Sequence, residues 1–188
     1  MSRPCALVPT LALAATLACL AIPAPPADAA SNAAPPIPAE LTINTIDGEP
    51  LSFGDLRGRA VLLDFWATWC KPCRMASPYL RRLHKRLGDN EHFVLVGVSS
   101  DSDLEALRAY VEEEEAAWTQ VWDSHDAIGN AFGVRSLPTY LILDHEGRPV
   151  KVLTGWSSRH PLALDAEIGR AVRKARRAAR RAARRAEG

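Results

Sequence analysis

A pair of cysteines, Cys70 and Cys73, stands where an apolar strand is expected to meet a helix, and this placement constrains the fold more than any other feature. The run Ala60–Trp66 is apolar apart from one acid, which predicts a buried central strand. A helix is predicted over residues 72–87, because apolar side chains recur there every four residues. These apolar residues are Met75, Tyr79, Leu83 and Leu87. The cysteine pair therefore lies at the start of a helix that follows a buried strand.

The rest of the chain predicts alternating strands and helices after an N-terminal β-hairpin at 41–53, which turns at Asp47 and Gly48. Asp101 or Ser102 is expected to cap the second helix. This alternation predicts an α/β domain with a mixed central sheet and helices on both faces. The other predicted elements are strands at 93–98, 119–122, 139–143 and 150–153, helices near 104–111 and 126–132, and a closing helix.

Residues 1–29 have the pattern of a secretory signal. Residues 6–22 are apolar with few interruptions, and Ala27 and Ala29 are small residues suited to cleavage before Ala30. The sequence therefore predicts an exported protein, in the periplasm or another extracytoplasmic space. Two alternatives stay open: an uncleaved membrane anchor, and lipidation of Cys19, which lies in a segment like a bacterial lipobox.

Three further segments follow this signal. An Ala- and Pro-rich tether is expected at 30–40, a folded domain at 41–169 and an Arg/Ala-rich tail at 170–188. Removal of the signal leaves only Cys70 and Cys73 in the mature chain, so no thiol is left over in an oxidising compartment. Structural zinc usually takes four protein ligands, and the chain has no second cysteine pair, so no metal site is expected.

The formal net charge of +1 hides a strong asymmetry. Residues 170–188 carry nine Lys or Arg and one acid, so the other 169 residues hold 14 basic and 21 acidic groups. The acidic balance of the body disfavours binding to nucleic acid. Arg and Ala alternate in pairs along the tail, which places them on opposite faces of a helix. The tail is either a solvated helix or a contact for anionic lipid or an acidic partner.

The placement of the cysteines favours thiol chemistry at Cys70. A helix N-terminus has unpaired N–H groups and a partial positive charge, and both stabilise a thiolate. Pro72 suits the first helical turn, and Lys71 adds a cation that lowers the pKa of the thiol further. Cys73 lies one turn on, where it can attack a mixed disulfide and release the substrate.

Two segments of the chain resemble the thioredoxin superfamily: residues 64–78 around the cysteine pair, and residues 133–140, which match the segment holding a cis-proline in that family. The resemblance covers residues 41–156 and implies a thioredoxin fold. The export signal, the N-terminal hairpin and an extra stretch at 102–128, a mid-domain insertion, resemble the TlpA/ResA branch. That branch consists of exported thiol–disulfide oxidoreductases.

The resemblance also assigns a client-binding surface. It implies a cis bond before Pro138 and a Leu137 backbone exposed to an extended client, which would pair with it as an added strand. Trp66 and Trp69 flank the cysteines, and we expect one of them, Trp69, to form a flat apolar contact while the other packs in the core.

Asp64 lies in the apolar strand six residues before Cys70, as in thioredoxin. Burial should raise the pKa of this carboxyl, so that it accepts the proton of Cys73 through a water molecule. The alternative is a carboxylate that only satisfies backbone donors. Ala76 stands where the ResA-like branch has a glutamate, and a thioredoxin lysine facing the acid aligns near Gly97. Proton transfer is therefore expected to depend on Asp64.

The sequence predicts an enzyme whose redox group is the Cys70–Cys73 disulfide, with no other cofactor. The resemblance implies that it reduces protein disulfides in cytochrome c or copper-oxidase assembly and receives electrons from a membrane donor of the DsbD/CcdA type. A Cu(I)-binding or copper-delivery module that uses the same two thiolates is the alternative. A peroxidase of the peroxiredoxin kind fits less well, because Thr68 and Trp69 echo its cysteine loop only loosely.

Overall fold

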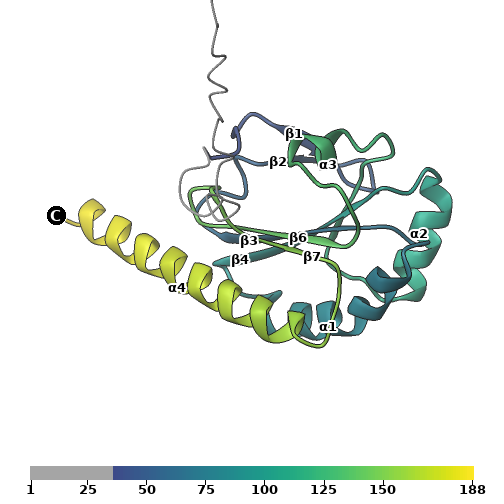
Figure 1. Cartoon of the computed structure of the whole chain (residues 1–188). Helices are drawn as coiled ribbons and strands as arrows, with labels where there is room; N and C mark the ends of the chain where they lie inside the picture. Colours follow the sequence, from purple (N-terminus) through teal and green to yellow (C-terminus); the bar gives the residue numbers. More distant parts are fainter. Residues whose placement is uncertain (1–35) are drawn as a thin grey trace, which may run out of the picture.

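The computed structural model describes residues 36–188 (Figure 1). The expected signal at 1–29, with Cys19, and most of the expected tether lie outside the described residues. The N-terminal hairpin is confirmed: β1 (Thr42–Asn44) pairs antiparallel with β2 (Pro50–Ser52). Gly48 adopts the positive φ that its turn requires.

The central sheet has five strands in the order β5-β4-β3-β6-β7. Strands β3, β4 and β5 run parallel to one another, and β6 pairs antiparallel with both β3 and β7, so the predicted mixed sheet is confirmed. The stretch 102–128 supplies helix α2 and the edge strand β5. The strands span Ala60–Trp66 (β3), Phe93–Ser99 (β4), Thr119–Trp122 (β5), Thr139–Leu143 (β6) and Pro149–Thr154 (β7).

Helices cover both faces of the sheet (Figure 1). Helices α1 and α4 lie along one face, and α3 lies with the hairpin on the other. A hydrophobic core lies on each face of the sheet, and successive side chains of β3 point to opposite faces. Leu62 packs toward α1 and α4, and Leu63 packs toward the hairpin. The helices span Lys71–Leu87 (α1), Leu104–Glu113 (α2), Ala127–Ala131 (α3) and His160–Ala186 (α4).

The predicted apolar face of α1 is wrong at its first residue. Met75 is 62% exposed, whereas Ala76 and Leu80 are buried. A spacing of four residues advances about 40° beyond a full turn at each step. Met75 therefore falls at the border of a buried face that Tyr79 and Leu83 share.

The predicted N-cap of α2 is also wrong, because neither Asp101 nor Ser102 is the capping residue. The cap is Asp103, whose carboxylate accepts hydrogen bonds from the backbone N–H groups of Glu105 (2.9 Å) and Ala106 (3.1 Å). Asp101 does not cap the helix, because its buried carboxylate accepts a hydrogen bond from the loop that precedes the cysteines.

Helix α4 is continuous across position 170. Ala171 packs in the core that contains α1, and Ala175 is also buried, so the first part of the Arg/Ala-rich stretch packs on the domain. The remainder of α4 extends past the body (Figure 1). Within residues 36–188, no helix combines the length and apolarity needed to cross a membrane.

Candidate active site

Cys70 and Cys73 form a disulfide at the start of α1, with an S–S distance of 2.02 Å. Cys70 is the N-cap of the helix, and its Sγ accepts a hydrogen bond from the backbone N–H of Cys73 at 3.3 Å. Pro72 lies in the first helical turn, and Lys71 is exposed beside it. The sulfur of Cys70 therefore sits at the positive end of the helix dipole, as the sequence predicts.

The two cysteines line different cavities. Cys70 lines an open cleft of about 640 Å³, together with Trp69, Lys71 and Leu137. Cys73 instead lines a narrow pocket of about 20 Å³ beneath it. Both cysteines are buried, at 5% and 6% exposed, so they differ in the cavity that each lines and not in exposure.

The cleft is walled by the start of α1, by α3 and by the loop at 134–137. The bond between Leu137 and Pro138 is cis, as the resemblance implies. Trp69 is 69% exposed at the cleft, whereas Trp66 is buried, donates a hydrogen bond to Gln120 Oε1 (3.2 Å) and packs on another aromatic ring. The two tryptophans therefore divide as the sequence predicts.

Asp101 holds the loop before Cys70, a contact that sequence analysis missed. Its carboxylate accepts hydrogen bonds from the Thr68 backbone N–H (3.0 Å), the Thr68 hydroxyl (2.6 Å) and the Ser99 hydroxyl (2.7 Å). Trp122 Nε1 donates to the Asp101 backbone carbonyl at 2.6 Å. The signal in the sequence is an acid two residues after the end of a buried strand, a position that also suits a helix cap.

Asp64 lies on the face of β3 toward α1 and lines the narrow pocket with Cys73. It is 3% exposed, and within residues 36–188 its Oδ1 has no hydrogen-bond partner. Burial raises the pKa of Asp64 to about 7, which confirms the predicted direction. A volume of about 20 Å³ is enough for one water molecule. The pocket thus has room for the predicted water near the carboxyl and Cys73.

The neighbours of Asp64 supply no positive charge within the sheet. Gly97 pairs with it in register, and a Cβ at Gly97 would lie 2.1 Å from Gln120 Oε1, so a side chain there would require Gln120 to move. Tyr140 pairs with Asp64 from β6, and within the described chain its hydroxyl has no partner. Burial, and then the charge of Asp64, raise the pKa of Tyr140.

The outer wall of the Asp64 pocket contains a carboxylate that sequence analysis also missed. Glu114 lines the pocket, forms an ion pair with Arg81 (2.6 Å) and accepts a hydrogen bond from the Ser77 hydroxyl (3.3 Å). Glu114 is the first residue after α2. It reaches the pocket of Cys73 only because α2 packs beside α1. Among residues 36–188, no group of three or more His, Cys, Asp or Glu side chains is placed to hold a metal ion.

Three comparisons with known proteins agree with one another: with a family model, with related sequences and with solved structures. A model of the AhpC/TSA family matches residues 31–151. The chain is 35% identical over 109 residues to the thioredoxin-like protein YneN of Bacillus subtilis, covering 57% of this chain and 64% of YneN, less than two thirds of that protein. It is 27% identical over 122 residues to the thiol-disulfide oxidoreductase ResA of Bacillus thuringiensis, covering 65% of this chain and 70% of ResA.

The fold is likewise similar to that of a solved structure. A protein from Chlorobium tepidum described as a thiol:disulfide interchange protein DsbE aligns with a TM-score of 0.66 at 25% identity, covering 70% of this chain and 92% of that one. The family match extends over more than half of the present chain. The chain therefore belongs to the AhpC/TSA family, with the thioredoxin-like fold and close cysteine pair of thiol–disulfide oxidoreductases of the ResA and DsbE type.

Proposed function

We propose that this protein is an exported thiol–disulfide oxidoreductase that reduces protein disulfides through a mixed disulfide at Cys70. The observation that carries the proposal is the separation of the two cysteines. Cys70 opens to the client cleft, and Cys73 lines the pocket of a buried carboxyl whose pKa is about 7. The nucleophile and the resolving thiol thus have different surroundings.

The cycle starts from the reduced protein. The Cys70 thiolate attacks one sulfur of a client disulfide, the client S–S bond breaks, and the other client sulfur leaves as a thiolate that takes a proton from water. Cys73 then gives its proton to Asp64 through one water and attacks the Cys70 sulfur. The mixed disulfide breaks, and the second client sulfur leaves as a thiolate that also takes up a proton. The client has gained two electrons, and the protein ends as the Cys70–Cys73 disulfide.

The groups around Cys70 favour this order. The helix N-terminus and the nearby cation of Lys71 both stabilise a thiolate at position 70, and Pro72 suits the first turn. Trp69 offers an exposed apolar ring at the cleft, and Leu137 lines the cleft beside it. An extended client segment that pairs with the Leu137 backbone would present its disulfide to Cys70.

The direction and the setting are the finer parts of the proposal. The signal-like residues 1–29 support export, with retention by an anchor or by a lipid on Cys19 as variants. A reductant outside the cytoplasm needs a supply of electrons, which a membrane donor of the DsbD/CcdA type would deliver. The resemblance to the TlpA/ResA branch supports a role in cytochrome c or copper-oxidase assembly.

Two single substitutions test the order of attack. Cys73→Ser should accumulate a mixed disulfide with a model disulfide substrate, whereas Cys70→Ser should abolish exchange, because only Cys70 faces the cleft. Mass spectrometry of the trapped adduct measures both outcomes. Trapping by Cys70→Ser and none by Cys73→Ser would reverse the roles.

Three further assays separate the candidate functions. Insulin reduction should be positive, whereas Cu(I) competition and peroxide turnover distinguish the copper-module and peroxidase alternatives. A reduction potential near thioredoxin's, about −270 mV, supports a reductant, and one near the DsbA value, about −120 mV, contradicts it.

A further inference from the structure

Helix α4 presents a strong positive charge far from the cysteines. Lys174 and Arg170 are ion-paired, with Asp144 (2.7 Å) and Glu167 respectively. The other arginines of its second half form no ion pair with an acidic side chain of residues 36–188, and all are exposed. These residues are Arg173, Arg176, Arg177, Arg180, Arg181, Arg184 and Arg185.

Part of this charge lines a groove of about 760 Å³ between α4 and the β6–β7 turn. The turn contributes His145 and the single acid Glu146. Ala178 and Ala182 form the remaining surface. We call the six basic residues that line the groove the cationic face of α4: Arg170, Arg173, Lys174, Arg177, Arg181 and Arg185.

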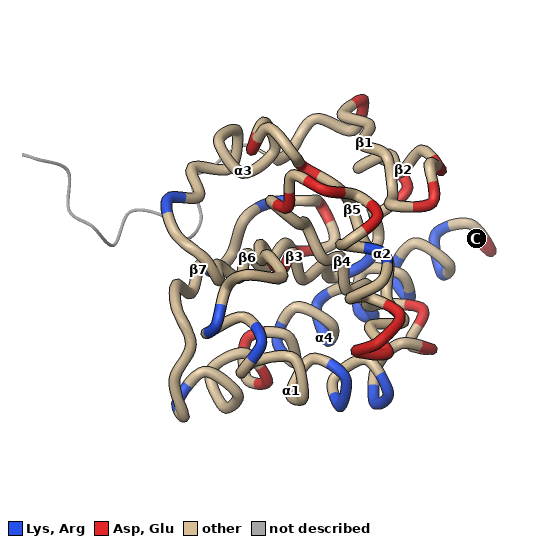
Figure 2. The backbone as a smooth tube through the Cα atoms, turned by 90° about the vertical axis from the view of Figure 1, so that its right-hand side faces the viewer, with Lys and Arg blue, Asp and Glu red and all other residues tan. Residues whose placement is uncertain are grey.

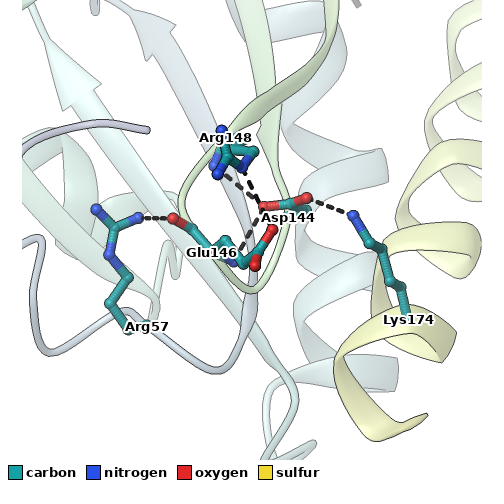
Figure 3. A network of polar contacts seen from close by, with 5 residues as sticks. All are labelled: Arg57, Asp144, Glu146, Arg148 and Lys174. Atoms are coloured by element: carbon teal, nitrogen blue, oxygen red, sulfur yellow. Dashed lines mark hydrogen bonds and ion pairs between the residues drawn. The ribbon is translucent and has the colours of Figure 1, made fainter. Parts of the chain in front are cut away.

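Asp144 clamps α4 to the same turn (Figure 3). Its buried carboxylate accepts hydrogen bonds from Lys174 Nζ (2.7 Å) and from the backbone N–H groups of Glu146 (2.9 Å) and Arg148 (3.1 Å). Burial alone would raise the pKa of Asp144, but these hydrogen bonds and the charge of Lys174 together lower it. The clamp therefore ties the middle of α4 to the β6–β7 turn.

The described chain begins at this turn as well. The backbone N–H of Ile37 donates to the carbonyl of Gly147 at 3.0 Å, and the Arg57 guanidinium donates to the carbonyls of Ile37 and Glu146. The described residues therefore begin beside the cationic face, and the sequence before them includes the apolar run 6–22.

The cysteines lie at the other end of the sheet. Leu143, the residue before the turn, pairs with Val61 near the start of β3, whereas Cys70 follows the end of β3 at Trp66. Seven residues of strand span roughly 20 Å. A surface that contacted the cationic face would thus meet the end of the sheet opposite to Cys70.

We propose that the cationic face of α4 binds the headgroups of anionic phospholipids at a membrane surface and orients the domain with its Cys70 cleft away from that surface. Guanidinium groups bind phosphate well, and each basic residue near an anionic surface adds to attraction. The apolar side of the extension consists of alanines, so the helix adsorbs by charge without deep insertion. The described chain begins at this end of the domain, and the sequence before it contains the apolar run 6–22, which favours a membrane over an acidic protein as the partner. The lipid assignment does not depend on the thiol chemistry, whereas the orientation is tested through Cys70.

Vesicle binding of the full chain tests the proposal. Binding is compared between phosphatidylcholine vesicles and vesicles in which a third of the lipid is phosphatidylglycerol. Any contribution of the apolar run is common to both, so the difference reports the charge interaction. We expect stronger binding to the anionic vesicles, with a gain that falls as salt rises.

Two matched triple variants locate the interaction. The first variant replaces Arg177, Arg181 and Arg185 with Gln. It should lower the gain in binding to anionic vesicles on the order of 100-fold. The control, Arg176, Arg180 and Arg184→Gln, removes the same charge from side chains outside the groove and should lower it less than about tenfold. Both variants keep good helix formers, and far-UV circular dichroism checks this.

The proposal also requires the cleft to stay open on the membrane. Exchange of Cys70 with a soluble disulfide should proceed at the same rate on anionic vesicles as in solution. No gain on anionic vesicles, as would follow if the partner were an acidic protein, overturns the lipid assignment. Equal losses in the two triple variants, or blocked exchange on vesicles, overturn the orientation.

Discussion

Asp64 and Asp144 are almost equally buried, at 3% and 2% exposed, yet their pKa values shift in opposite directions. Burial raises the pKa of Asp64 to about 7, because within residues 36–188 its Oδ1 has no hydrogen-bond partner. Burial also acts to raise the pKa of Asp144, but hydrogen bonds from two backbone N–H groups and from Lys174 outweigh it. The difference shows that the donors around a carboxylate decide its charge, and not burial alone.

The two aspartates also divide the molecule by role. Asp64 lies in the pocket of Cys73, where a carboxyl that titrates near neutrality can accept a proton. Asp144 lies at the other end of the sheet, where a permanent charge ties α4 to the β6–β7 turn. Figure 2 shows basic residues along α4 and acidic ones concentrated on other parts of the chain.

The largest expected effect is the loss of the clamp. Asp144→Ala should lower the free energy of unfolding by about 3 kcal/mol, because it leaves two backbone N–H groups and Lys174 without their acceptor. Urea unfolding measures the change. Glu146→Ala is the control and should stay within about 0.5 kcal/mol, since its side chain is exposed. Equal effects of the two substitutions would show that Asp144 is not a clamp.

Asp64→Asn should affect rate more than stability. Resolution of the mixed disulfide by Cys73 should slow by about 100-fold, because the proton acceptor is lost. At pH 7 the stability should be unchanged or higher, because a buried charge is removed. Stopped-flow decay of the mixed disulfide and urea midpoints measure the two effects. A variant with lower stability and an unchanged rate would make Asp64 a structural acid.

The pH dependence of stability should separate the two carboxyls. Below about pH 3.8, Asp64 is neutral in the folded and unfolded chain and costs nothing. As the pH rises toward 7, the unfolded chain ionises first, so the wild type loses stability relative to Asp64→Asn. Above pH 7 the difference is constant.

Asp144 has the opposite sign. Its folded pKa is lowered, so its stabilising contribution is present above pH 3.8 and is lost as the pH falls through the folded pKa. The difference between wild type and Asp144→Ala should therefore shrink in acid. Urea titrations at a series of pH values measure how each variant's stability difference from the wild type depends on pH. If the contributions of Asp64 and Asp144 changed with pH in the same direction, the comparison would be wrong.

The smallest expected effect concerns the hydroxyl next to Asp64. Tyr140→Phe should change the free energy of unfolding by less than about 0.5 kcal/mol, because that hydroxyl has no partner within the described residues. Tyr79→Phe is the matched comparison and should cost about 1 kcal/mol, since it removes a hydrogen bond to Asp165 (3.0 Å). A larger loss for Tyr140→Phe would indicate a bridging water between Tyr140 and Asp64.

Local sequence patterns determined much of this protein. The apolar run that forms β3 and the cysteines that start α1 depend on neighbours a few residues apart, so strand, helix cap and thiol chemistry follow from spacing. The same run predicts the raised pKa of Asp64, because six apolar residues around one acid imply desolvation. The fold class followed from the alternation of such segments.

Only the tertiary structure determined which residues far apart in the sequence come into contact. Asp101 binds Thr68 over 33 residues, Lys174 binds Asp144 over 30, and Glu114 reaches the pocket of Cys73 only because α2 packs near α1. The cavity that each cysteine faces follows from the same packing. No local periodicity encodes such pairings, because they arise from the way sheet and helices bury their apolar faces together.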